Sequence, residues 1–419
     1  MNRRAFLSAA GAAGLAASGA ISLPRLAFAD ERSKLKITGL RLVQTRPKRQ
    51  PPAYTPSPNA WSTLGVEIAN PLSIYPEYKP RRELFFPDPG KVPSFTVEVE
   101  TDKGIKGYGN GGPGGGMVVV DHLAKLLVGR DPFDLERNWD IMWRGTMHYG
   151  RMGIVMNAIS GVDLALWDIV GRALNEPVWR LLGGETKPRI PAYCTGNDID
   201  QHIEFGFTRL KLAMAHGPAS GRSGMRENEA LVKETRRKLG PDGEIMLDCW
   251  MAWTERYTIE MAEMLAPYRV YWMEECLPPH DYAGFGRLNA AIHSTRIATG
   301  EHEYGRYGFR SLLEHQAAQI WQPDINWCGG LTELRRIGAL AAAYDIPVIP
   351  HAGGLNEAAH WILATPNAPW AELFLPPPGG PPEVYQIHEE QYGISRGPEG
   401  IYMRPSDRPG FGLDIEVTS

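Results

Sequence analysis

Ionisable side chains close a series of short apolar runs in the second half of this 419-residue chain. Asp248, Glu274 and Glu301 follow one another at intervals of 26 and 27 residues, and Glu275 is an alternative to Glu274. Adjacent strand residues point to opposite faces, so we expect only one of these two glutamates to reach a shared site. Three converging carboxylates cannot all be ionised without a cation, and an all-oxygen set favours Mg²⁺, or Mn²⁺ as a substitute, over zinc.

A histidine and two further acids follow on the next three runs. His351 ends the apolar run Ile346–Pro350 and lies 27 residues after Asp324, the same interval again. This spacing predicts an Asp-His pair in which the carboxylate orients the ring and raises its basicity. Glu372 ends the last run and could exchange a proton or hydrogen-bond developing charge, or it could be a buried structural acid.

The elements that must position these residues begin near residue 190, where strand-like runs alternate with amphipathic helical patterns. The predicted strands are Ile190–Cys194, Thr208–Ala213, Glu244–Cys249, Val270–Cys276, Arg296–Glu301, Gln319–Ile325, Ile346–Ala352 and Trp370–Leu375. Predicted helices include Glu227–Leu239, Ile259–Leu265, Phe309–His315 and Leu331–Tyr344. Eight such units indicate a (β/α)8 barrel, in which the carboxyl ends of all strands meet at one face. An open doubly wound sheet is the alternative, but no GxGxxG motif supports it.

The first half of the chain has a mixed α+β pattern. Lys36–Val43, Phe95–Val99 and Ile105–Tyr108 are predicted to form an antiparallel meander, followed by helical periodicity over Met117–Leu127 and Asp134–Trp143. A proline-dense stretch from Pro47 to Pro93 is expected to be an irregular loop, and loops of that length are usually functional.

The N-terminal residues are typical of a targeting segment. Arg3 and Arg4 precede an apolar stretch from Ala5 to Ile21, and small residues at Ala27–Ala29 offer a cleavage site. The stretch resembles a twin-arginine export signal, and a membrane anchor is the alternative although the run falls short of about 20 apolar residues. We therefore expect a periplasmic location without stable membrane association after cleavage, or a cytoplasmic one if the signal is not used.

Composition narrows the class of partner. The chain is 43% hydrophobic and 22% charged with a formal net charge of −4, which gives no electrostatic footprint for nucleic acid. A small-molecule partner is the default. Four cysteines lack CxxC spacing, and we predict buried free thiols in preference to a disulfide framework.

Several ordered motifs resemble those of the mandelate racemase branch of the enolase superfamily, and most closely those of L-rhamnonate dehydratases. The resemblance covers the chain from about residue 36 onward. It is carried by Asn157–Asp168, Pro177-Val178, Leu181–Gly184, Met246–Trp250, Trp272–Pro279, Thr299–His302, Gln322–Asp324, Trp327–Gly330 and Arg408–Gly412.

The resemblance implies a barrel with an α+β N-terminal capping domain, and it implies roles for single residues. Expected domains are an export signal over 1–29, a capping domain over 30–155, the barrel over 156–385 and a segment over 386–419 that returns to the capping domain. The implied metal ligands are Asp248, Glu274 and Glu301. The implied catalytic residues are His351 as base, Asp324 as its partner, Glu372 as a hydrogen-bonding stabiliser and Lys211 as a second base or an electrostatic group, and Arg82 is the implied substrate-binding arginine.

The implied reaction is Mg²⁺-dependent dehydration of a sugar acid to a 2-keto-3-deoxy acid, in a homo-oligomer. One departure concerns substrate identity: the resembling dehydratases share a histidine on the amino-terminal loop, and no histidine precedes His122 here. We expect a residue near Tyr54 or Thr55 to take the place of this histidine. The alternatives are a racemase or epimerase that uses Lys211 and His351 on opposite faces, and an exported sugar-acid binding protein without turnover.

Overall fold

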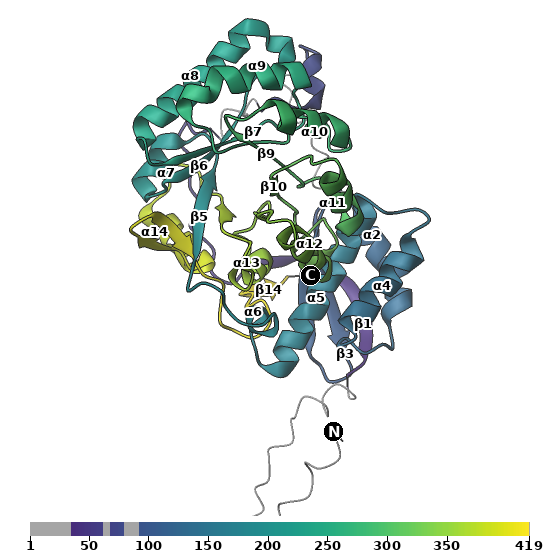
Figure 1. Ribbon diagram of the computed structural model, residues 1–419. Helices are drawn as coiled ribbons and strands as arrows, with labels where there is room; N and C mark the ends of the chain where they lie inside the picture. Colours follow the sequence, from purple (N-terminus) through teal and green to yellow (C-terminus); the bar gives the residue numbers. More distant parts are fainter. Residues whose placement is uncertain (1–34, 62–67, 79–91, 419) are drawn as a thin grey trace, which may run out of the picture.

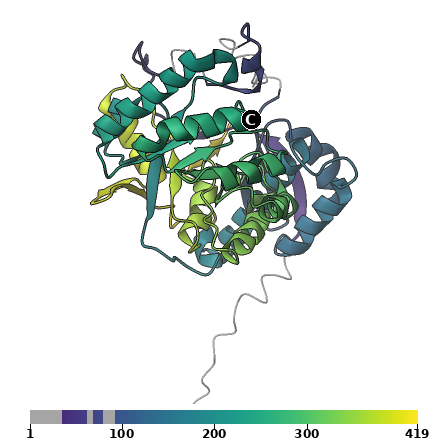
Figure 2. The ribbon, with the colours of Figure 1, turned by 45° about the horizontal axis from the view of Figure 1, so that its top comes forward.

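The computed structural model describes residues 35–61, 68–78 and 92–418. The predicted export signal over 1–29 and the predicted substrate-binding Arg82 lie outside the described residues. The chain forms a barrel with a smaller α+β part packed beside it (Figure 1). Figure 2 gives a second view of the same two parts.

The smaller part is built on a three-stranded antiparallel sheet in the order β1-β3-β4, with β1 over Ile37–Val43, β3 over Phe95–Thr101 and β4 over Lys106–Gly111. The predicted meander is therefore confirmed. Helix α5 (Ile154–Leu174) packs on this sheet, and a Cβ at Gly109 would lie 2.1 Å from the carbonyl oxygen of Gly161. Glycine is required there because backbone and helix touch directly.

Short helices complete this part. They are α2 (Gly116–Val118), a π-turn η3 (Val119–Leu123), α3 (Ala124–Leu127) and α4 (Leu135–Thr146). The predicted loop over 47–93 contains strand β2 (Thr45–Pro47) at its start and one 3-10 turn, η1 (Pro71–Ile74), among its described residues. By length and composition α5 could cross a membrane, but 94% of its apolar window is buried, which is typical of a core helix.

The barrel strands follow one another around a parallel sheet. They are β5 (Ile190–Thr195), β6 (Arg209–Ala213), β7 (Glu244–Asp248), β8 (Trp272–Glu274), β9 (Arg296–Thr299), β10 (Ile320–Trp321) and β11 (Ala371–Leu373). Each of β5 to β9 pairs in parallel with the next strand, which ends the series at β10, and β11 pairs in parallel with β5 on the other side. The side chains of Tyr193, Met246, Trp272, Ala298, Ile320 and Ile349 fill its interior.

The predicted seventh strand is the exception. Among the described residues, Ile346–Ala352 makes only an isolated parallel bridge between Val348 and Trp321, so the prediction of a full strand there is wrong. Pro347 and Pro350 explain the difference, because proline has no N–H to donate to a ladder. The segment still occupies the seventh place in the ring, since Ile349 N donates to Trp321 O at 2.8 Å.

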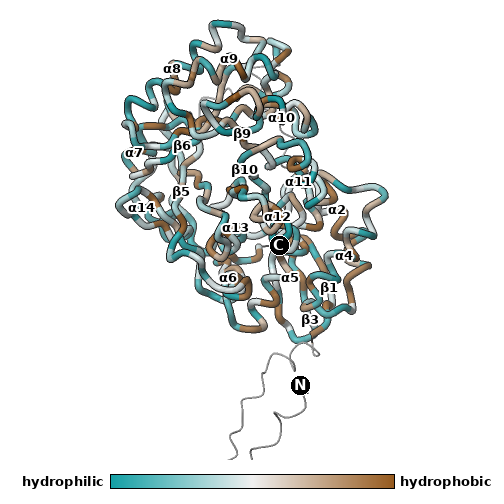
Figure 3. The backbone as a smooth tube through the Cα atoms, in the orientation of Figure 1, coloured by the Kyte–Doolittle hydropathy of each residue, from teal (hydrophilic) through white to brown (hydrophobic). Residues whose placement is uncertain are grey.

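Helices surround the barrel (Figure 1). They are α6 (Val178–Leu181), α7 (Ile199–Phe205), α8 (Gly221–Leu239), α9 (Glu255–Leu265), α10 (Tyr282–Ala291), α11 (Gly305–Glu314), α12 (Gly330–Ala342), α13 (Asn356–Leu363) and α14 (Pro382–Tyr392), with 3-10 turns η4 (Pro218–Ser220) and η5 (Ala266–Tyr268). The four predicted amphipathic segments lie within α8, α9, α11 and α12 or extend one or two residues past them. Hydrophilic and hydrophobic stretches alternate along α8 and α9 in Figure 3, as expected when one face packs on the strands.

The C-terminal residues connect the two parts. Strand β12 (Ser395–Gly397) pairs with β13 (Gly400–Met403), β13 pairs with β5, and β14 (Ile415–Val417) pairs with β2 near the amino terminus. The predicted domain boundaries stay predictions. The one after residue 155 falls inside α5, which packs on β3 and β4 and also on α12. All four cysteines are free and buried, as predicted.

Candidate active site

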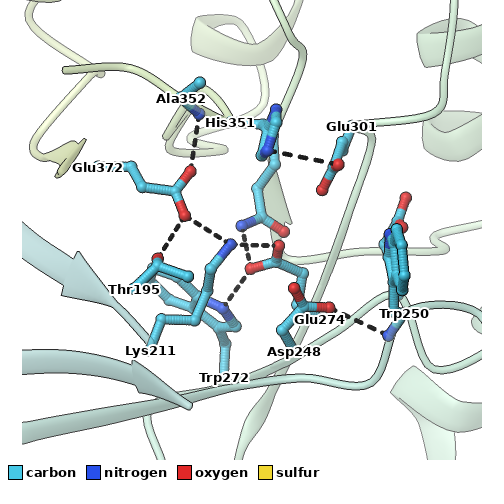
Figure 4. A network of polar contacts seen from close by, with 12 residues as sticks. Thr195, Lys211, Asp248, Trp250, Trp272, Glu274, Glu301, His351, Ala352 and Glu372 are labelled. Carbon is cyan, nitrogen blue, oxygen red and sulfur yellow. Dashed lines mark hydrogen bonds and ion pairs between the residues drawn. The ribbon is translucent and has the colours of Figure 1, made fainter. Parts of the chain in front are cut away.

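The strands of the barrel bring seven of the predicted site residues to one region, and Figure 4 labels all of them except Asp324. Asp248 and Glu274 end β7 and β8, and Glu301 follows β9 by two residues. Lys211 lies on β6 and Glu372 on β11, while Asp324 and His351 follow the sixth and seventh positions of the ring. These residues come from the second to the eighth positions of the ring, one residue from each position, so the barrel brings them together.

The three predicted cation ligands are carboxylates in surroundings that disfavour their charge. Desolvation is the main cause that raises the pKa of Asp248, Glu274 and Glu301, each to about 7. Repulsion adds to this, because Glu301 acts on Asp248 and Asp248 acts on Glu274, whereas Lys211 opposes it. A divalent cation would remove this repulsion, and carboxylate oxygens are the ligands that Mg²⁺ prefers. The residues therefore fit Mg²⁺.

Lys211 lies between two of the acids (Figure 4). Its Nζ is 2.7 Å from Glu274 Oε1 and 2.9 Å from Glu372 Oε1, and the side chain is 1% exposed. Burial alone would lower the pKa of Lys211, but the two carboxylates outweigh it and raise the pKa well above its usual value. The ammonium is therefore held in its charged form.

Glu372 is surrounded by donors. Its Oε1 accepts from Thr195 Oγ1 at 2.5 Å and its Oε2 accepts from Ala352 N at 2.7 Å, in addition to the contact with Lys211. Burial raises the pKa of Glu372, but Lys211 and His351 outweigh it and bring it to about 2. The carboxylate is thus ionised and can only accept hydrogen bonds.

His351 and Asp324 form the predicted pair. His351 Nδ1 is 2.7 Å from Asp324 Oδ2, and Asp324 Oδ1 accepts from the backbone N of Asn326 at 2.6 Å. A carboxylate can only accept, so Nδ1 carries a proton, and Nε2 has the lone pair when the ring is neutral. That nitrogen faces the carboxylate cluster, because His351 Nε2 is 3.4 Å from Glu301 Oε1. Burial lowers the pKa of His351, but Glu301 and Asp324 outweigh it and raise the pKa to about 10, so the ring becomes a base only when the charge of Glu301 is offset, as a bound cation would do.

Glu275 departs from the expectation that only one of the two adjacent glutamates reaches the site. It follows the last residue of β8 with a φ of 45°, so the alternation of faces no longer applies there. Its carboxylate lies 2.9 Å from Nδ1 of His302 and, with His302 and Glu301, forms a group whose ligand atoms are all within 4.8 Å of one another. Both Glu274 and Glu275 therefore lie next to the predicted cation site.

The two glutamates differ in how their charge is balanced. Burial raises the pKa of Glu275, but His302 outweighs it and lowers the pKa, while Glu275 in turn raises the pKa of His302 to about 9. A protonated imidazole cannot bind a cation. The pair is thus neutralised internally, and this favours Asp248, Glu274 and Glu301 as the ligand set.

Strained backbone accompanies these residues. Trp250, Met251, Glu275 and Ala352 all have positive φ, and each follows a strand end that carries a site residue. Non-glycine residues in this region cost about 1 to 3 kcal/mol each and are concentrated at functional sites. At Ala352 the turn directs the backbone N–H at Glu372.

Four side chains that contact the site were not predicted as site residues from the sequence. Thr195, Trp272, Gln322 and His302 all contact predicted residues, through hydrogen bonds of 2.5 to 3.0 Å. The motifs that resemble the dehydratases contain Trp272, Gln322 and His302. Polar residues were expected at the ends of β5 and β10, so their position could have indicated Thr195 and Gln322. Tyr54, one of the residues expected near the missing histidine, donates to Pro377 O at 2.9 Å.

Both parts of the chain match protein families that are already described. Residues 197–418 match the family described as enolase C-terminal domain-like, and residues 89–183 match the N-terminal domain of mandelate racemase and muconate lactonizing enzyme. An L-rhamnonate dehydratase of Saccharopolyspora erythraea is 40% identical over 351 residues, which cover 83% of this chain and 89% of that protein.

Solved structures give the same result. The crystal structure of rhamnonate dehydratase from Gibberella zeae complexed with Mg is 35% identical, with a TM-score of 0.77 over 91% of this chain and 94% of that one. The 3,6-anhydro-D-galactonate cycloisomerase from Zobellia galactanivorans is 30% identical, with a TM-score of 0.65 over 77% and 91%. The barrel and its companion domain are thus shared by proteins whose reactions differ.

Proposed function

Because the chain belongs to the mandelate racemase and muconate lactonizing enzyme family of the enolase superfamily, we propose that it dehydrates a rhamnonate-like sugar acid with Mg²⁺ as cofactor. The product would be a 2-keto-3-deoxy acid. The observation that carries the proposal is the pair His351 and Asp324, in which Asp324 binds Nδ1 and the other ring nitrogen, Nε2, faces Glu301 of the carboxylate cluster.

The base in this proposal is His351 Nε2. Asp324 fixes the proton on Nδ1, so the opposite nitrogen takes the proton from C2 of the substrate, and the resulting imidazolium is stabilised by the same carboxylate. The C3 hydroxyl then leaves as water with a proton that His351 returns, and the enol product tautomerises to the keto acid. One proton is taken and one is given back, so His351 ends the cycle neutral.

Lys211 and Glu372 support this step by charge. The Lys211 ammonium, held between Glu274 and Glu372, supplies fixed positive charge close to where negative charge develops. Glu372 can accept a hydrogen bond from a substrate hydroxyl and so orient it.

The predicted cation ligands are Asp248, Glu274 and Glu301. When bound, Mg²⁺ would draw negative charge onto the substrate carboxylate and so lower the cost of removing the neighbouring proton. The fully acidic ligand set and its raised pKa values support this assignment.

A racemase of the same family is the second possibility from sequence, and the position of Lys211 argues against it. A racemase needs a second base on the opposite face of C2, and a base must have a free lone pair. Lys211 Nζ is bonded to two carboxylates that keep it protonated. This favours an electrostatic role and therefore dehydration.

A screen of purified protein with Mg²⁺ against aldonic acids tests the proposal, with 2-keto-3-deoxy products detected by a carbonyl reagent. A product from rhamnonate or a related acid is expected, and the His351→Asn variant should neither form it nor exchange the C2 proton in D2O. His315→Asn is a matched control, because His315 is exposed at the far end of α11 from the site residues named above and contacts Ser311 O and the ring of Tyr282. Exchange of the C2 proton without loss of water would indicate a racemase, and saturable binding without either reaction would indicate a binding protein.

A further inference from the structure

Gln322 is a fully buried residue whose amide side chain reaches from the sixth position of the ring to the fourth. It follows β10, and its backbone N donates to Thr299 O at 3.0 Å, which fixes it beside β9. The side chain reaches past that strand to β8, where Nε2 donates to Glu274 Oε2 at 2.6 Å. No spacing in the sequence points to this contact, because the two residues are 48 positions apart.

The contact completes a set of donors around Glu274. Oε1 accepts from Lys211 Nζ at 2.7 Å, and Oε2 accepts from Trp272 Nε1 at 3.0 Å as well as from Gln322. Three donors, on β6, on β8 and directly after β10, therefore fix both oxygens of one carboxylate. Each donor comes from a buried side chain, so the orientation of the carboxylate does not depend on solvent.

A purely structural account of Gln322 is incomplete. Its Oε1 is buried and has no hydrogen-bond partner among the described residues. A buried amide that serves only packing would be better replaced by an apolar residue of similar size, because the unpaired oxygen is unfavourable. Within the described part of the chain, the bond to Glu274 is thus the one favourable polar interaction that the side chain makes.

We propose that Gln322 is a positioning residue for cation binding, because it holds Glu274 in the orientation that a divalent cation requires. This inference rests on the proposed function through the assignment of Glu274 as a ligand. Residues that hydrogen-bond a metal ligand from outside typically contribute 10- to 100-fold to metal affinity. The amide of Gln322 is suited to this task, since it donates to the carboxylate without adding a charge that would repel a cation.

Mn²⁺ titration tests the inference, with free Mn²⁺ followed by its electron paramagnetic resonance signal and no substrate present. Gln322→Leu should weaken Mn²⁺ binding by about 10- to 100-fold. The same variant should keep or raise the midpoint of thermal unfolding in EDTA, because it removes the unpaired Oε1. A structural residue would give the reverse pattern, a lower midpoint with unchanged Mn²⁺ affinity.

Matched variants separate the outcomes. Gln319→Leu changes the same residue type just before β10, where its side chain accepts from Ile297 N and not from a site residue, and should leave Mn²⁺ affinity unchanged. Gln322→Met keeps the length of the side chain without a donor and repeats the test if the leucine variant does not fold. Mn²⁺ affinity within twofold of the wild type in the folded variant would overturn the inference.

Glu274→Gln shows which step has failed. If this variant loses Mn²⁺ binding while Gln322→Leu retains it, the inference is wrong and the assignment of Glu274 stands. If Glu274→Gln itself binds Mn²⁺ normally, the ligand assignment in the proposed function is wrong and the role of Gln322 falls with it.

Discussion

Replacement of Asp324 by asparagine should inactivate the enzyme through the position of one proton. Asp324 Oδ1 accepts from Asn326 N at 2.6 Å, and Oδ2 faces His351 Nδ1 at 2.7 Å. In Asp324→Asn the amide oxygen must take the position beside the Asn326 N–H, because an NH2 group there would place two donors against each other. The NH2 group then faces Nδ1 and donates to it.

The consequence is the wrong tautomer of His351. Nδ1 becomes the acceptor, so the ring proton moves to Nε2, which is the nitrogen that should take the substrate proton. General base catalysis is typically worth about 10² to 10⁴-fold, and the comparable Asp to Asn change in a Ser-His-Asp triad costs about 10⁴-fold. We expect kcat to fall by about 10³-fold or more, which corresponds to about 4 kcal/mol in the activation free energy.

The assay is C2 proton exchange in D2O by NMR together with formation of the keto acid, on protein whose circular dichroism matches the wild type. Asp324→Ala is the matched variant. It removes the same charge but leaves no donor against Nδ1, so it should retain more exchange activity than Asp324→Asn. Equal losses in the two variants would contradict the tautomer argument, and a loss below tenfold in Asp324→Asn would refute the role of the pair.

Three further predictions concern the cation, pH and targeting. Mg²⁺ at 100 times its Kd should stabilise the fold by about 2.7 kcal/mol relative to EDTA, measured by chemical unfolding, and Asp248→Asn should remove most of this effect. Burial lowers the pKa of His360 in the folded protein from 6.5 to about 3. Because His360 in the unfolded chain takes up its proton at higher pH, the free energy of unfolding decreases as pH falls from about 6.5 towards 3. The loss at pH 5 should be about 2 kcal/mol, and His360→Gln should show less of it in urea unfolding at pH 7 and 5. Replacing both Arg3 and Arg4 by lysine should keep the protein in the cytoplasm on cell fractionation, and unchanged export would contradict a twin-arginine signal.

The fold could be predicted from the sequence because the barrel repeats one short βα unit along the chain. Each βα unit repeats an apolar run and an amphipathic helix, and intervals of 26 or 27 residues between Asp248, Glu274 and Glu301 follow from one unit per interval. The same regularity predicts that these residues meet at one end of the barrel. The seventh run was wrongly predicted as a full strand, because its apolar pattern resembles a strand although Pro347 and Pro350 have no N–H to donate to a ladder.

The remaining contacts could not be predicted because they depend on side-chain reach across the barrel. Thr195, Trp272 and Gln322 are ordinary strand residues in sequence, and their role appears only when Glu274 and Glu372 lie within hydrogen-bonding distance. The backbone conformation of Glu275 is another such case. A positive φ at a non-glycine residue has no sequence signal, yet it brings the second glutamate of the pair to the same site.

The charges of the network explain why its members are distributed over so many strands. Lys211 lies between Glu274 and Glu372 and balances them, while Asp324 binds Nδ1 of His351 and so leaves Nε2 facing Glu301. Distribution over β6, β8 and β11 on one side and the sixth and seventh positions on the other keeps the two pairings apart, so that the base and the fixed positive charge can act on the same substrate without neutralising each other.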